Sequence, residues 1–166
     1  MEQYFIKFSL LILFLPLAAF LVQIFFGRRL PRQGDWVSIG AIAGTLILSL
    51  LMFASMLTSY NLEFSKSASF TWLDMGEFSI RLGFLIDNIT IIMLLVVALI
   101  STCTHIFSLE YMAGDIRYSR YFAYLGLFTF SMNGIVLANN LISMYIFWEL
   151  VGVSSFLLIR HWFEKD

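Results

Sequence analysis

The chain has 166 residues, of which 60% are hydrophobic and 13% charged, and its net charge is −1. A typical soluble domain is about 45–50% apolar and about 25% charged, and a chain of this size cannot bury so much apolar surface in a water-soluble fold. The composition predicts an all-α membrane protein embedded in the lipid bilayer. The near-neutral charge gives no indication of nucleic-acid binding, and the single cysteine excludes an intrachain disulfide.

The first two stretches that are long and apolar enough to cross a bilayer are residues 5–26 and 36–57. A membrane-spanning helix needs about 20 mostly apolar residues, and Pro16 in the first stretch is better tolerated there than in a soluble helix. Gly40 and Gly44 in the second stretch allow a neighbouring helix to approach closely. The first stretch is longer than the apolar core of about 7–15 residues in a signal peptide, so we expect a retained helix.

A polar segment, residues 59–86, separates the second span from the third. Two short runs of alternating character, 69–73 and 78–84, flank the tetrapeptide Asp74-Met75-Gly76-Glu77. Alternation with a period of two residues around a turn sequence is typical of a β-hairpin. We therefore predict a short β-hairpin outside the bilayer.

The third span is predicted at residues 88–107, directly after Asp87, whose carboxylate is well placed to cap it. Polar residues recur on one face of this helix with helical spacing: Ser101, Thr104, His105 and Ser108. A histidine that titrates near neutral pH can relay protons. Its ring can equally serve only to bind a neighbouring helix, and both interpretations of His105 stay open.

Residues 121–163 are apolar throughout and too long for a single span. Asn139-Asn140 interrupts them with residues that favour turns. The prediction is a tight helical hairpin with spans at 121–138 and 141–163, which brings the total to five transmembrane helices. The chain then has three regions: residues 1–58 with spans one and two, residues 59–86 with the hairpin, and residues 87–166 with spans three to five.

The distribution of basic residues predicts the orientation, because cytoplasmic loops carry an excess of lysine and arginine. Seven of the ten lie in the first loop, the third loop and the C-terminal tail: Arg28, Arg29, Arg32, Arg117, Arg120, Arg160 and Lys165. The opposite side has Lys7, Lys66 and Arg81. We expect an external N-terminus and a cytoplasmic C-terminus.

Glu149 is the candidate proton carrier. It lies about eight residues into the fifth predicted span, near the middle of the bilayer. A charged carboxylate at that depth costs about 2.5 kcal/mol or more, so it must face protein, water or a cation, or be protonated. Gly152 lies about one turn further along and leaves room beside it. The alternative is a structural glutamate that bonds a neighbouring helix.

The other polar groups predict no catalytic centre in this chain. Thr129 and Asn133, four residues apart, are expected to join helices rather than to form a proton path. Asp87 is expected to act as a helix cap. We find no glycine-rich nucleotide motif, no metal-ligand cluster and no nucleophile–base pair in the sequence.

The stretch HIFSLEYMAGDIRYSRYFAYLGLFTFSMNGIVLANNLISMYIFWELVGVSSFLLIRHWF, residues 105–163, resembles the core of the L-subunit family of respiratory complex I. The preceding WLDMGEFSIRLGFLIDNIT, residues 72–90, resembles the hairpin that leads into helix three of that family. The resemblance implies a proton-pumping, antiporter-like subunit with no redox cofactor of its own. NADH, FMN, iron–sulfur clusters and quinone are then expected in partner subunits, in a bacterial inner membrane.

The resemblance also implies roles for individual residues. The glutamate of the family's W-E motif, essential to the channel, falls on Glu149 beside Trp148, and the family's histidine falls on His105. The aspartate before helix three falls on Asp87. Five further residues are expected to support these: Ser101, Thr104, Ser108, Trp148 and Gly152.

Family members carry many more helices, among them a broken helix with a lysine that partners the glutamate. We therefore expect a split or truncated subunit, or an incomplete chain. We also expect a partner chain that supplies the missing helices, and other membrane-arm subunits beside it. The sequence W-E-L-V-G at 148–152 favours the L type. A component of a multi-subunit sodium/proton antiporter and a non-transporting membrane scaffold remain alternatives.

Overall fold

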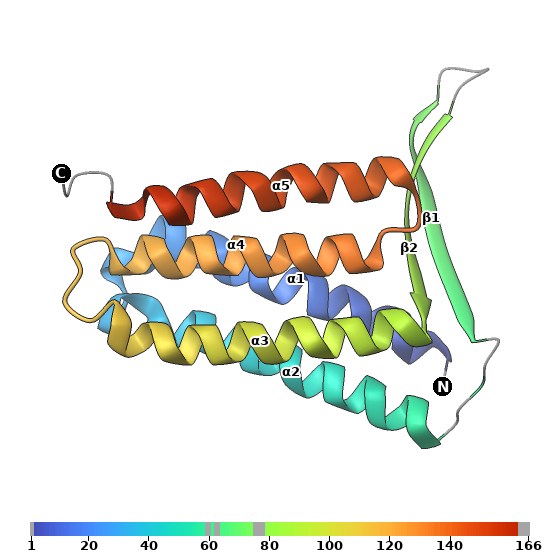
Figure 1. Cartoon of the computed structure of the whole chain (residues 1–166), viewed down its shortest axis with the longest axis horizontal. Helices are drawn as coiled ribbons and strands as arrows, with labels where there is room; N and C mark the ends of the chain where they lie inside the picture. The colour runs from blue at the N-terminus through green and yellow to red at the C-terminus, as the bar shows by residue number, and fades with distance from the viewer. Residues whose placement is uncertain (1, 59–60, 62–63, 75–78, 163–166) are drawn as a thin grey trace.

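Five α-helices and one β-hairpin are the main elements in the part of the chain that the structure describes, as Figure 1 shows for the computed structural model. The structure describes residues 2–58, 61, 64–74 and 79–162. The helices are α1 (Glu2–Phe26), α2 (Asp35–Thr58), α3 (Asn88–Tyr111), α4 (Tyr118–Leu137) and α5 (Leu141–Ile159). The predicted order of five helices is confirmed. A 3₁₀ turn, Arg160–Trp162, follows α5, and the predicted end of that span, Phe163, lies outside the described residues.

Helices α1 to α4 form a bundle, and α5 packs on its outside. The most extensive helix contacts join α1 with α4, α2 with α3, and α1 with α2. The main helix partner of α5 is α4, so α4 lies between α5 and α3 (Figure 1). Any side chain of α5 that points away from α4 is therefore left uncovered by this chain.

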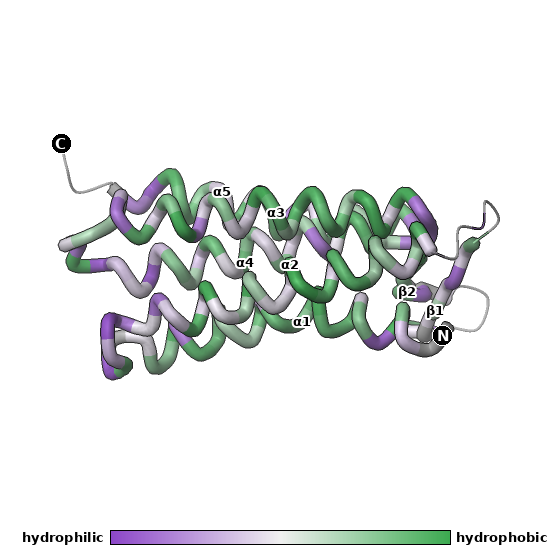
Figure 2. The backbone as a smooth tube through the Cα atoms, turned by 90° about the horizontal axis from the view of Figure 1, so that it is seen from below, coloured by the Kyte–Doolittle hydropathy of each residue, from purple (hydrophilic) through white to green (hydrophobic). Residues whose placement is uncertain are grey.

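Four described stretches are long and apolar enough to cross a membrane: Tyr4–Phe26, Pro31–Thr58, Asn88–Tyr111 and Leu141–Ile159. Helix α4 is not among them, although it runs alongside the others (Figure 1). Of its 20 residues, 12 are buried by neighbouring helices. A helix shielded in this way can carry more polar side chains, because they pair inside the protein instead of facing lipid. Figure 2 shows hydrophobic residues along the middle of the bundle and hydrophilic residues gathered towards its ends.

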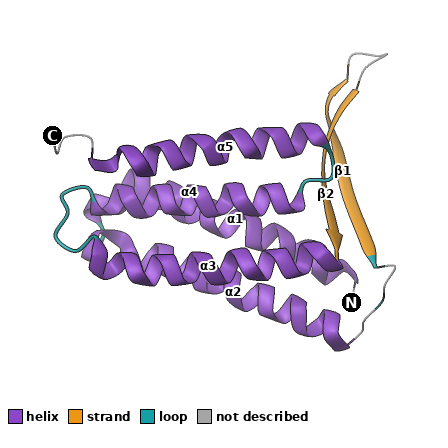
Figure 3. Ribbon diagram, viewed as in Figure 1, coloured by secondary structure: helices purple, strands orange, loops and turns teal. Residues whose placement is uncertain are grey.

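The β-hairpin consists of antiparallel strands β1 (Ser65–Asp74) and β2 (Ser79–Asp87), which lie across one end of the helices (Figure 3). The predicted hairpin is confirmed, but its strands are longer than the predicted runs. Pairing continues through polar residues from Asp74 opposite Ser79 to Ser65 opposite Asp87, because backbone hydrogen bonds do not require apolar side chains. The predicted turn residues 75–77, and Phe78, lie outside the described residues.

The turn between α4 and α5 is attached to strand β2. The backbone N–H of Asn139 donates to the carbonyl oxygen of Gly83 at 3.2 Å. The side-chain amide of Asn140 donates to the backbone carbonyl oxygen of Arg81 at 2.8 Å. A Cβ at Gly83 would collide with the Asn139 side chain. Asn140 also caps α5 by accepting from the N–H of Ser143 at 2.8 Å. The two asparagines thus form the predicted turn and also hold the hairpin against the bundle.

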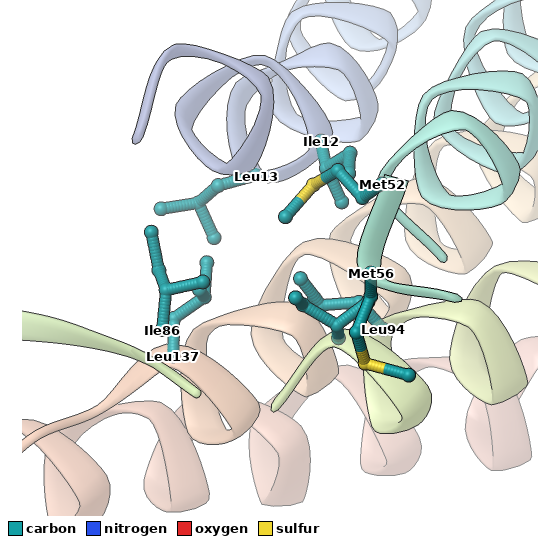
Figure 4. Close-up of a cluster of buried hydrophobic side chains, with 8 residues drawn as sticks. Ile12, Leu13, Met52, Met56, Ile86, Leu94 and Leu137 are labelled. Carbon is teal, nitrogen blue, oxygen red and sulfur yellow. The ribbon is translucent and has the colours of Figure 1, made fainter. Parts of the chain in front are cut away.

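A buried hydrophobic cluster fills the end of the bundle beneath the hairpin (Figure 4). It joins four helices and one strand, with members drawn from α1, α2, α3, α4 and β2: Ile12, Leu13, Met52, Met56, Ile86, Ile91, Leu94 and Leu137. Inside a bilayer, such side chains stabilise the fold through close packing, since lipid tails are as apolar as leucine. The cluster fixes the hairpin end of the bundle.

Candidate functional site

Glu149 lies in the middle of α5, on the face that points away from the bundle, and its side chain is exposed. Trp148 and Gly152 lie on the same uncovered face, and Trp148 is 64% exposed. Tyr145, one turn before Glu149, is exposed on this face as well. The predicted proton carrier therefore lies on the surface of this five-helix unit.

The space beside Glu149 is open. A Cβ added at Gly152 would meet no atom within 4 Å. The opposite face of α5 carries the residues that are buried, among them Ser143 and Ser154. The geometry leaves a stripe of α5, with the acid at its centre, free to be covered by another protein segment.

His105 is enclosed in the bundle between α3 and α4. Its exposed fraction is 1%, and its ring nitrogen Nδ1 lies 2.8 Å from the carbonyl oxygen of Ser101. The hydroxyl of Ser101 lies 2.6 Å from that of Thr129 on α4, and Thr129 also donates to the carbonyl oxygen of Leu125 at 3.0 Å. These three side chains form one hydrogen-bonded cluster inside the membrane-spanning part of the bundle.

The geometry assigns the protonation of the His105 ring. A carbonyl oxygen only accepts hydrogen bonds, so Nδ1 must carry the hydrogen that faces Ser101. In a neutral imidazole the other nitrogen, Nε2, then carries the lone pair. Nε2 is buried and has no hydrogen-bond partner among the described residues, while the ring of Phe122 lies beside it with the two centroids 6.0 Å apart. The lone pair of the neutral ring is thus at Nε2, inside the bundle.

Two polar contacts and one aromatic contact lie between this region and the end of the bundle that carries the α3–α4 loop. The hydroxyl of Ser108, one turn after His105, lies 3.4 Å from that of Tyr121. The rings of Tyr121 and His161 pack edge to face, with their centroids 5.4 Å apart. Nε2 of His161 lies 3.3 Å from Oδ1 of Asp115. The sequence pattern does not link His161 with Tyr121, because only the tertiary fold brings the end of α5 to the start of α4.

Of the predicted polar stripe, Ser101, His105 and Ser108 are buried on one face of α3. Thr104 lies at the edge of that face, is only partly buried, and donates to the carbonyl oxygen of Ile100 in its own helix at 2.9 Å. Asp87 caps α3, because its Oδ1 accepts from the N–H of Thr90 at 2.7 Å.

Asp35, at the start of α2, is a buried acid that sequence analysis did not single out. Its exposed fraction is 2%. Its carboxylate accepts from the Tyr118 hydroxyl at 3.1 Å, the Arg32 guanidinium at 3.1 Å and the N–H of Trp36 at 2.7 Å. Its place directly before an apolar run is the signal of a helix N-terminus that would have identified it. Asp35 and Asp115 line one open polar cavity of about 430 Å³.

Glu149 and His105 are not brought together. His105 faces the α3–α4 interface, and α4 separates it from α5, whose outer face carries Glu149. Thr129 and Asn133 join helices as predicted: Thr129 contacts Ser101 of α3, and Asn133 donates to the carbonyl oxygen of Ile12 in α1 at 3.2 Å. The described residues contain no group of three or more histidine, cysteine or acidic side chains that could hold a metal ion.

Two family models match the chain. Residues 72–122 match the N-terminal part of chain 5 of NADH-ubiquinone oxidoreductase (complex I). Residues 138–166 match the transmembrane region shared by NADH:quinone oxidoreductase and the Mrp antiporter. The matched residues include the hairpin strand β2, helix α3 and the helix that carries Glu149.

Curated relatives match nearly the whole chain. The NADH-ubiquinone oxidoreductase chain 5 of Cryphonectria parasitica is 40% identical over 93% of this chain. The F(420)H(2) dehydrogenase subunit L of Methanosarcina mazei is 39% identical over 96%, and the NADH-quinone oxidoreductase subunit L of Neisseria meningitidis is 36% identical over 94%. The chain spans 23% of the length of each of these relatives.

A solved structure has the same fold. It is the membrane-bound sulfane sulfur reductase, described as an archaeal respiratory membrane complex. One of its chains superposes with a TM-score of 0.71, at 13% sequence identity, over 89% of this chain and 29% of that chain. At this identity the likeness supports the fold.

Proposed function

The chain belongs to the family of complex I chain 5 and subunit L, and from this premise we propose that it is a proton-translocating subunit of the membrane arm of a complex I-like NADH-quinone oxidoreductase. The structural observation that carries the proposal is His105, a titratable side chain enclosed in the bundle with one ring nitrogen unpaired. An ionisable residue within a membrane-spanning segment is costly and usually marks an ion or proton pathway.

In the proposed route, protons enter from the open cavity at Asp115 and pass by His161, Tyr121 and Ser108 towards His105. Asp115 and His161, and Tyr121 and Ser108, are within hydrogen-bond distance. His161 and Tyr121 touch only through their rings, so a water molecule must link them on this route. Between Ser108 and His105 lies one helical turn, a separation of about 5–6 Å between Cβ atoms that one water molecule can bridge. The basic loops favour an assignment of the cavity end of the bundle to the cytoplasm.

Glu149 is the switching carboxylate in this proposal. Because its face of α5 is uncovered, the cation that changes its proton affinity must come from a segment outside these five helices. We propose that this segment also supplies the lysine-bearing helix expected from the family, either within a longer chain or from a partner chain. Other membrane-arm subunits then surround it, and NADH, FMN, iron–sulfur clusters and quinone reside in partner subunits.

The proposed location is a bacterial inner membrane, with the N-terminus and hairpin external and the C-terminus cytoplasmic. The experiment that tests the function replaces Glu149 with Gln and measures proton pumping in vesicles that contain the assembled complex. We expect pumping to fall by at least about 10²-fold, the usual contribution of a positioned proton-transfer group, with normal assembly. Glu110→Gln, an exposed glutamate at the end of α3, is the matched control. Normal pumping by Glu149→Gln at normal assembly contradicts the proposal.

A second candidate function is supported by the match of residues 138–166 to a region shared with the Mrp antiporter. In that case the chain exchanges sodium for protons as part of a multi-subunit antiporter. Sodium-dependent proton exchange in vesicles without any redox substrate favours the antiporter. Proton uptake that requires NADH and quinone favours the complex I-like function.

A further inference from the structure

Pro16 leaves one carbonyl oxygen of α1 without its usual partner. Proline has no backbone N–H, so the carbonyl oxygen of Ile12, four residues earlier, cannot form the hydrogen bond that continues the helix. Ile12 is 0% exposed, so no solvent reaches that oxygen. An unpaired backbone group is strongly destabilising inside a bilayer. The donor for this oxygen must therefore come from another helix.

Asn133 of α4 supplies this donor. Its side-chain nitrogen donates to the carbonyl oxygen of Ile12 at 3.2 Å, and the exposed fraction of Asn133 is 0%. A carbonyl oxygen only accepts hydrogen bonds, so the amide must present its nitrogen to α1. Its other polar atom, Oδ1, has no hydrogen-bond partner among the described residues. The amide is thus held by one contact, which joins α4 to the point where Pro16 interrupts the backbone bonding of α1.

Helix α4 meets α1 at three positions that are seven residues apart. The hydroxyl of Ser119 donates to the carbonyl oxygen of Gln23 at 3.3 Å. A Cβ added at Gly126 would lie 3.2 Å from the carbonyl oxygen of Pro16, so the two backbones approach closely there. Asn133 is the third position. Seven residues are about two helical turns, so all three lie on the one face of α4 that packs on α1.

The adjoining face of α4 meets the part of α3 that carries His105. Thr129, one turn before Asn133, lies 2.6 Å from the Ser101 hydroxyl. Phe122, seven residues before Thr129, packs beside the ring of His105 with the two centroids 6.0 Å apart. A helix transmits a displacement as a rigid element over such short distances. The place where α4 is fixed on α1 therefore also sets the place where it meets α3.

We propose that Asn133 is a positioning residue for proton transfer at His105. By pairing with the carbonyl oxygen that Pro16 leaves free, Asn133 fixes α4 on α1. This holds Thr129 against Ser101, whose backbone carbonyl oxygen orients the His105 ring. The role in proton transfer rests on the proposed function of His105, whereas the pairing of Asn133 with α1 does not.

The test compares Asn133→Leu in the native background and in a Pro16→Ala background. Leucine is close to asparagine in shape but has no donor, and alanine at position 16 restores the backbone N–H that pairs the Ile12 carbonyl oxygen within α1. Unfolding of the assembled complex in detergent, arranged as a double-mutant cycle, measures stability. Protons pumped per NADH oxidised are measured in vesicles. Ser131→Ala, which removes a buried hydroxyl bonded within α4 itself, is the matched control.

We expect Asn133→Leu to lower the folding equilibrium constant about tenfold in the native background, equivalent to about 1.4 kcal/mol, and less than about twofold with Pro16→Ala. Pumping per NADH should fall about tenfold in Asn133→Leu, because a misplaced transfer group slows the reaction. It should recover with Pro16→Ala and be unchanged in Ser131→Ala. If Asn133→Leu alone does not assemble, the expected result is that the double variant does.

Three outcomes overturn the proposal. An equal loss of stability in both backgrounds, or failure to assemble in both, shows that Asn133 does not serve the carbonyl oxygen that Pro16 leaves free. Unchanged pumping per NADH in a destabilised Asn133→Leu shows that the contact is structural only. Normal pumping by His105→Gln contradicts the proposed function instead, and the stability coupling between positions 16 and 133 is then unaffected.

Discussion

The interior between α3 and α4 and the outer face of α5 each carry one titratable residue, but they are built in opposite ways. His105 is fully enclosed, and its ring is oriented by Ser101 and by a serine–threonine contact that joins two helices. Glu149 is exposed, and its near neighbours on the same helix are Tyr145, Trp148 and Gly152. The five helices therefore enclose one of the two residues and leave the other exposed.

Of the predictions that compare the two regions, we expect the largest effect for His105→Gln, measured as the rate of proton pumping. Glutamine retains a donor for the Ser101 carbonyl oxygen but cannot take up a proton, so we expect pumping to fall about 10²-fold while assembly is retained. Proton uptake by vesicles with the assembled complex measures this. Thr102→Ala, which removes a hydroxyl bonded within α3 itself, is the control and should pump at a rate close to normal. If His105→Gln pumps normally, the histidine is structural.

The next effect tests whether α5 depends on its contact with α4. A Cβ at Gly134 of α4 would collide with the ring of Phe147 of α5, so Gly134→Leu should destabilise the packing by about 1–3 kcal/mol, as overpacked sites do. Thermal unfolding of the purified complex, detected as protease cleavage within α5, measures the change in stability. Gly40→Leu is the control, because its Cβ meets no atom within 4 Å. Equal stability of the two variants would show that α5 is held by other contacts.

The smallest effect concerns the contact that joins α3 to α4. Replacing Ser101 by Ala and Thr129 by Val, singly and together, should give a coupling free energy of about 0.6 kcal/mol, the average for hydrogen bonds between membrane helices. A double-mutant cycle on unfolding in detergent measures it. The pair Thr45 and Ser131, each bonded within its own helix, should show no coupling. A coupling of zero for Ser101 and Thr129 would mean that their contact does not stabilise the interior cluster.

The sequence alone determined the helices, the hairpin, the turn at Asn139-Asn140 and the cap at Asp87, because hydrophobic periodicity, chain length and capping chemistry act between residues close in sequence. Helical spacing also placed Ser101, His105 and Ser108 on one face. Only the tertiary structure decided which neighbour each face meets. It turned His105 inward and Glu149 outward, paired His161 with Asp115, and buried Asp35 against Tyr118. Those outcomes depend on which helices pack together. The spacing of residues defines the face of a helix, but it does not determine which neighbouring helix covers that face.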